Sequence, residues 1–207
     1  MSSKQLHIGV FMPSSVQLLD LATVDVLASM SKEYLRLLPL PAHISEIAPS
    51  TKITYITSPK LFPTVNLTAD LSVRASHTYE DDDVSPGKLD IIVVPGTDPA
   101  DEFEEASTKW LRDHFNTVGV DVLYSRRPPG GITNGNDLMA AYAQAQNKYW
   151  PNSISKLGAM LVDVGDRPQI YHQSQRKFFI VFAWQVVQGW LFSMVPFGKG
   201  SGEDTSI

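Results

Sequence analysis

The chain has 207 residues, 43% of them hydrophobic and 19% charged, with a formal net charge of -5. This length suits one well-buried core or at most two small domains. The acidic balance argues against nucleic acid as a partner, because phosphate binding needs clustered basic residues, and the pairs Arg126-Arg127 and Arg176-Lys177 have no further basic neighbours. Cysteine is absent, which excludes disulfides, thiolate metal sites and a cysteine nucleophile.

The first elements read as a strand, a helix and a second strand. The apolar run Leu6–Met12 ends at a proline and predicts a buried strand of the parallel type. An apolar stripe at the helical period predicts a helix over Val16–Met30, with Ser14 and Ser15 as candidate caps. The alternating segment Lys52–Thr57 predicts the second strand.

Strand and helix continue to alternate through the middle of the chain. Val65–Arg74 could form a short strand or a hairpin, and the four acids of Glu80–Asp83 are typical of a solvated loop, since a metal site would need more oxygen ligands around one point. A buried strand is predicted at Leu89–Val94, a helix at Ala100–Asn116, and a short strand at Val120–Tyr124. This order predicts an α/β fold with a mostly parallel sheet.

After Asp137 the pattern changes to helix following helix. A first helix opens near Asp137, a second covers Ile154–Val164, and a third covers roughly Ser174–Met194. The uncharged stretch Phe178–Phe197 within the third is long enough to span a bilayer, but polar residues interrupt it, and we favour a buried packing helix over a membrane span. The N-terminus has no long apolar segment of the secretory type, so we expect a cytoplasmic protein.

Four stretches together resemble the DJ-1/PfpI family, in its fungal branch related to isonitrile hydratase: IGVFMPSSVQLLDLATVDVLASMSKEYL, KLDIIVVPGTDP, GGITNGNDLMAAY and DVGDRPQIY. The resemblance implies a three-layer, flavodoxin-like fold of the class I glutamine amidotransferase type. It implies one domain over residues 1–207, with an N-terminal α/β part at 5–125 and a C-terminal helical part at 130–194. Relatives commonly dimerise, so a homodimer is expected.

The segment that carries the family's nucleophile is missing. Members typically continue the strand at Val120–Tyr124 into a sharp turn with a nucleophilic cysteine, and aligning the strands puts that position at Arg126. A guanidinium stays protonated and cannot act as a nucleophile. The family pattern resumes at Gly130-Gly131, so the fold is expected to be truncated in the middle by roughly fifty residues. Either the protein is shortened, or coding sequence was skipped, and the abruptness of the join favours the second.

Part of the site can be carried over by resemblance. Asp20 matches the acid that faces the cysteine across the pocket, where it would hold or exchange a proton. Gly96 and Thr97 match the loop whose backbone N–H groups help to form an oxyanion hole, although relatives more often have a second glycine at the Thr97 position. By itself, the sequence around Asp20 would suit a helix-surface acid.

No replacement for the cysteine is evident in the sequence. Ser125 is next to the expected position, but a serine needs a base within hydrogen-bond reach. The histidines show no metal-ligand spacing, with one on a core strand and one in a helix expected to be exposed: His7, His43, His77, His114 and His172. We therefore predict no nucleophile, no metal and no cofactor.

The sequence leaves three functions open. The first is a non-catalytic or truncated DJ-1/PfpI-like protein, with a small-molecule ligand still possible. The second is an isonitrile hydratase or lyase-type enzyme of a metabolic pathway whose active-site segment is lost from this sequence. The third and weakest is a protein tethered to a membrane through Phe178–Phe197.

Overall fold

The computed structural model describes residues 5–97, 100–124 and 134–164, together with single helical positions at Ile180, Trp184, Val187 and Gln188. The chain divides into two compact units, residues 1–169 and 170–207, and apart from those four positions every described residue belongs to the first. The expected helix at Ser174–Met194 otherwise lies outside the described residues. In the part of the chain that the structure describes, no helix is long and apolar enough to cross a bilayer.

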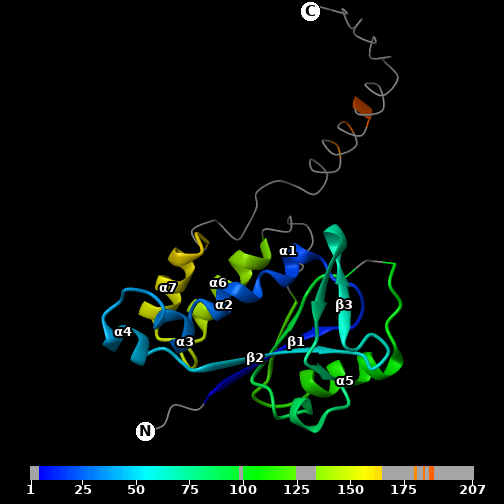
Figure 1. The fold of residues 1–207 in the computed structure, drawn as a ribbon, viewed down its shortest axis with the longest axis horizontal. Coiled ribbons are helices and arrows are strands. Elements are labelled where there is room, and N and C mark those ends of the chain that lie inside the picture. The colour runs from blue at the N-terminus through cyan, green and yellow to red at the C-terminus, as the bar shows by residue number, and fades with distance from the viewer. Residues whose placement is uncertain are drawn as a thin grey trace, which may run out of the picture. The chain divides into compact units, whose positions relative to one another are not determined.

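A five-stranded parallel sheet forms the centre of the first unit (Figure 1). Its order is β5 (His77–Thr78), β2 (Thr51–Thr57), β1 (Leu6–Met12), β6 (Ile91–Val94) and β7 (Asp121–Tyr124), and every neighbouring pair is parallel. The predicted α/β class and its strands are confirmed. The most apolar runs, β1 and β6, take central positions because both of their faces are buried there.

The segment at 64–74 is a hairpin outside this sheet. β3 (Thr64–Leu67) pairs antiparallel with β4 (Leu71–Arg74) across a short 3₁₀ turn, so the second of the two predicted alternatives is the observed one. Its turn includes Ala69 and Asp70 with positive φ, which lets the chain reverse within three residues.

The predicted helix at Val16–Met30 is in fact two short helices, α1 (Leu18–Leu21) and α2 (Val24–Ala28). Between them Thr23 donates its hydroxyl to the carbonyl oxygen of Asp20 at 2.7 Å, and its N–H also approaches that carbonyl rather than one four residues back. A threonine hydroxyl that competes for local carbonyls interrupts the regular helical ladder. The apolar stripe survives the break, because both short helices still face the sheet.

The predicted caps Ser14 and Ser15 are also wrong. The residue before α1 is Gln17, which gives no side-chain cap, and the N–H of Leu18 instead donates to Oγ1 of Thr68 at 2.9 Å. The cap therefore comes from the hairpin turn, fifty positions along the chain.

The remaining helices are α3 (Lys32–Leu35), α4 (Ala42–Glu46), α5 (Glu105–Phe115), α6 (Asn134–Ala145) and α7 (Asn152–Leu161). The three longer ones confirm the predicted helices, with α5 starting five residues later than expected. A 3₁₀ turn, η2, covers Asp82–Val84 within the acidic run.

One face of the sheet is covered by α2, α6 and α7 (Figure 1). Trp150, Met139 and Ile154 are fully or almost fully buried there against β1 and β6. α7 approaches the segment just after α2 so closely at Gly158 that a Cβ on this glycine would overlap Cγ of Met30. The absence of a side chain at this point leaves room for Met30.

The opposite face is covered by α5 (Figure 1). Trp110 of α5 packs on Phe11 with ring centroids 4.6 Å apart, and His114 lies against Trp110 at 4.0 Å. The expectation that His114 is exposed is wrong, because its side chain is fully buried. It is four residues after Trp110, so it shares the buried side of the helix with that residue.

The short connection after β7 leads directly to a helix. α6 follows β7 after about nine residues, too few for a crossover to another parallel strand. Among the described residues no strand follows β7. The next element is α6, which packs against α2 and α7. β7 forms an edge of the described sheet.

Candidate functional site

The residues expected at the site meet where β1 and β6 end. The extended segment after β1 lies between the hairpin and the loop that follows β6: the N–H of Gln17 donates to the carbonyl of Gly96 at 2.8 Å, and Val16 pairs with both Thr97 and Leu67. In open α/β sheets ligands bind at the carboxyl ends of the strands. The structure therefore brings Asp20, four residues after Val16, to the same edge as Gly96 and Thr97.

Asp20 is buried rather than exposed. The residue is 1% accessible to solvent and both carboxylate oxygens are shielded from it. The interpretation of Asp20 as a helix-surface acid is wrong, since it lies on the inner side of α1, next to buried Leu21. A buried carboxylate is costly unless other groups stabilise it, which makes this position unusual for a residue with no role beyond solubility.

The backbones of Gly96 and Thr97 are paired with the segment that precedes α1. The carbonyl of Gly96 accepts the Gln17 N–H, and Thr97 is bridged to Val16 in antiparallel fashion. The loop is thus fixed in place by the segment leading to α1. The role of these two residues as an oxyanion hole stays a prediction.

β7 ends at Tyr124 on the side where relatives would place the nucleophile. Tyr124 is half exposed, and burial of the rest of the side chain raises the pKa of its phenol above the usual value. Ser125, Arg126 and Gly130-Gly131 lie outside the described residues. The phenol at the end of this strand is therefore neutral at physiological pH, and a neutral phenol is a weak nucleophile.

Two of the described histidines, His7 and His114, are engaged in other parts of the fold. His7 is near the start of β1, with Nε2 2.8 Å from Oγ1 of Thr54, and burial together with the nearby charge of Lys52 lowers its pKa. Burial likewise lowers the pKa of His114, whose Nδ1 is 2.9 Å from the carbonyl oxygen of Trp110. Both imidazoles are held neutral by packing on other parts of the sheet.

The sequence did not predict the role of Asp121, which links the edge strand β7 to the helical part of the fold. Asp121 of β7 accepts the hydroxyl of Tyr142 at 2.7 Å and pairs with Lys148 at 3.1 Å. Burial and this carboxylate raise the pKa of Tyr142 strongly. The only sequence signal was a lone acid at the start of a strand, which has many ordinary explanations.

No protein-family model matches the sequence, and a comparison with curated proteins found no match. Solved structures do match, at low sequence identity. A THiJ/PfpI family protein from Pseudomonas syringae gives a TM-score of 0.56 and 11% identity over 92% of this chain and 89% of that one. Oxidized DJ-1 from Toxoplasma gondii gives 0.52 and 10%, over 77% of this chain and 98% of that one. The fold is that of DJ-1/PfpI proteins.

The likeness extends to an AraC family transcriptional regulator from Pseudomonas putida, with a TM-score of 0.54, 13% identity, and coverage of 76% of this chain and 99% of that one. At such identities the comparisons establish the flavodoxin-like α/β fold alone. They confirm the predicted family likeness at the level of structure and leave the isonitrile hydratase branch a prediction.

Proposed function

We propose that this chain, as its sequence stands, is a non-catalytic protein with a DJ-1/PfpI-like fold. The observation that carries the proposal is the complete absence of cysteine, the nucleophile of the chemistry that the family resemblance implies. What the chain keeps is the opposite side of the site: the buried acid Asp20 and the loop at Gly96 and Thr97. The ligand suited to such a half-site is a small molecule.

The geometry of the described residues supports this proposal in two ways. Tyr124, the described residue that precedes the expected nucleophile position in the sequence, has a raised pKa and offers a neutral phenol. A serine or tyrosine nucleophile also needs a base within hydrogen-bond reach, and His7 and His114 are engaged elsewhere. The role that the family resemblance gives to Asp20 is to hold or exchange a proton, not to attack the substrate.

The test is an activity assay on the purified chain with two matched variants. We expect no hydration of an alkyl isonitrile and no hydrolysis of glutamine above the buffer background, for the unchanged chain, for Asp20→Asn and for Asp25→Asn. Asp25 is the control because it is an exposed acid on α2, a few residues from Asp20. Turnover that copurifies with the protein and falls in Asp20→Asn, but not in Asp25→Asn, contradicts the proposal.

A second candidate is an isonitrile hydratase or lyase-type enzyme whose active-site segment is absent from this sequence. It is favoured by the position of β7, which lies at the edge of the described sheet and leads to α6 after about nine residues, where the family resemblance implies a helix and further strands. Sequencing the transcript across Tyr124–Gly130 distinguishes the two. An insert of roughly fifty codons that includes a cysteine supports the enzyme, and a continuous reading supports the shortened protein.

A further inference from the structure

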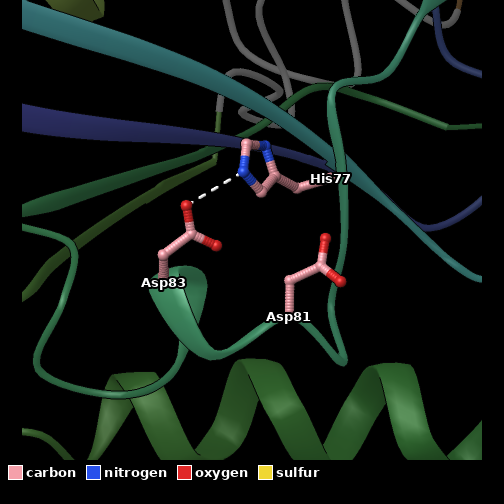
Figure 2. Close-up of side chains that lie close together, drawn as sticks. All are labelled: His77, Asp81 and Asp83. Carbon is pink, nitrogen blue, oxygen red and sulfur yellow. Dashed lines mark ion pairs between the residues drawn. The ribbon is translucent and has the colours of Figure 1, made fainter.

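Three metal-ligating side chains converge at the far edge of the sheet, away from Asp20. His77 of β5 and the acids Asp81 and Asp83 of the turn that follows it each offer one ligand atom, and these atoms all lie within 4.8 Å of one another. Figure 2 shows the imidazole directed toward Asp83, with Asp81 on the same side of the histidine but set apart from that pair. Nε2 of His77 is 2.9 Å from Oδ2 of Asp83.

Groups outside the cluster hold two of the three ligands in position. Nδ1 of His77 is 2.9 Å from the hydroxyl of Ser76, which leaves Nε2 directed at the acids. The carboxylate of Asp81 accepts the backbone N–H of Thr78 at 3.0 Å and lies 3.3 Å from its hydroxyl. In metal sites, a hydrogen bond to the second ring nitrogen of this kind orients a ligating histidine.

The distances suit cis ligands of one ion. Bonds of about 2.1 Å place neighbouring ligand atoms about 3 Å apart at a right angle and about 3.4 Å apart at the tetrahedral angle typical of Zn²⁺. Nε2 of His77 and Oδ2 of Asp83, which form an ion pair at 2.9 Å, are close to this range. The nearest oxygen of Asp81 lies within 4.8 Å of both of these atoms. One imidazole with two carboxylates is a donor set for divalent first-row transition ions, whereas Mg²⁺ and Ca²⁺ prefer oxygen alone.

The surroundings of the three side chains are open to water. The side chain of His77 is 24% exposed and that of Asp83 is 53% exposed. Asp83 also borders a surface hollow of about 400 Å³ whose other lining residues are His7, Lys52, Asp82 and Lys88. The ammonium of Lys52, 4.0 Å from Oδ2 of Asp83, is the nearest competing cation.

We propose that His77, Asp81 and Asp83 form a binding site for a divalent first-row transition ion of the Zn²⁺ type, with water completing the coordination. The ion would connect β5, which pairs with β2 through only two residues, to η2, because Asp83 lies within η2 and Asp81 precedes it. The site is independent of the proposed function, because it lies on a different edge of the sheet and uses none of the same residues.

The test is titration of the full chain with Zn²⁺ by calorimetry, with Mg²⁺ as a parallel arm. We expect one Zn²⁺ per chain, no measurable Mg²⁺ binding, and a loss of affinity of at least about tenfold in His77→Ala and in Asp83→Asn. Asp82→Asn is the matched control, since Asp82 lies between the two acids but is not among the three ligands, and it should bind Zn²⁺ as the unchanged chain does. Absence of Zn²⁺ binding, or equal binding by all variants, overturns the proposal.

A measurement on the unchanged protein decides the question if a variant fails to fold. Diethyl pyrocarbonate modifies accessible imidazoles, and bound Zn²⁺ should slow modification of His77 at least severalfold while leaving exposed His43 unaffected. Mass spectrometry of the digested protein gives the rate at each histidine. Equal rates at His77 with and without Zn²⁺ rule the site out.

Discussion

The two faces of the sheet are packed by different kinds of side chain. The face under α2, α6 and α7 is filled by Trp150, Met139, Met30 and other apolar groups from segments more than a hundred residues apart. The face under α5 includes a buried imidazole, His114, packed at a tilt against Trp110, and the proposed metal site lies near this helix (Figure 2). The stability of the first face should therefore depend on side-chain volume. The second face should be sensitive to pH and to metal ions in the solution.

The largest effect is expected from truncating the centre of the first face. Trp150 is fully buried and packs edge-on against Tyr142 and Tyr149, at centroid distances of 6.3 and 5.7 Å. Trp150→Ala should lower the free energy of unfolding by about 3–5 kcal/mol, because it leaves a large cavity. Phe115→Ala is the control: this aromatic ring is 68% exposed, and its loss should change stability by under about 0.5 kcal/mol. Urea unfolding measures both, and equal effects would mean that the helical layer is not packed as described.

A smaller effect is expected from adding one methyl group on the same face. Gly158→Ala would place its Cβ on Cγ of Met30, so we expect a loss of about 1–3 kcal/mol in unfolding free energy, despite the better helix propensity of alanine. Ser153→Ala, on the exposed side of α7, controls for propensity and should be neutral or slightly stabilising. In a double-mutant cycle Met30→Ala should offset part of the cost of Gly158→Ala, since the two side chains meet directly. A cycle without coupling would contradict the contact.

The smallest effect concerns the second face and depends on pH. Burial holds the pKa of His114 below 6.5, so the unfolded chain binds a proton at a higher pH than the folded chain does. Stability should be constant above about pH 7 and should fall as the pH drops through 6.5 toward the depressed pKa. His114→Gln should make this slope shallower, while His43→Gln, at an exposed position, should leave it unchanged. His7, whose pKa is also lowered by burial, contributes to the slope in the same direction and remains in His114→Gln. Urea unfolding at several pH values gives the slope directly, and an identical slope in all three proteins excludes this role of His114.

Strands were predictable because their signal is local. Seven residues or fewer are enough to indicate which faces of these strands are buried. The signal is an apolar run in β1 and β6 and an alternating pattern in β2. The helix at 16–30 was mispredicted because an apolar stripe indicates only which residues are buried. It does not show that the hydroxyl of Thr23 bonds to the carbonyl of Asp20 and interrupts the helical hydrogen bonds there. His114 was misplaced because the charged residues beside it suggested exposure, while its position relative to Trp110 determines the side it occupies.

Contacts between distant segments were not predictable in the same way. The cap of α1 comes from Thr68, and the neighbourhood of Asp20 and Gly96 was expected only from the family resemblance. The cluster around His77 needed the position of β5 beside β2, which a two-residue strand does not reveal in sequence. The spacing of His77, Asp81 and Asp83 is a possible signal, but it is short enough to be common by chance.

The central position of β1 determines the order in which this sheet can be completed during synthesis. Its partner β2 begins 45 residues after it, since Leu6 pairs with Thr51, but its other partner comes from much further along, with His7 bonded to Asp90 at a separation of 83 residues. At the usual ribosomal rate of about 5–20 residues per second, β1 waits roughly 4–17 s for β6. During that interval the nascent chain presents one unpaired edge of its most apolar strand, and this is the period in which association with another chain or a chaperone competes with folding.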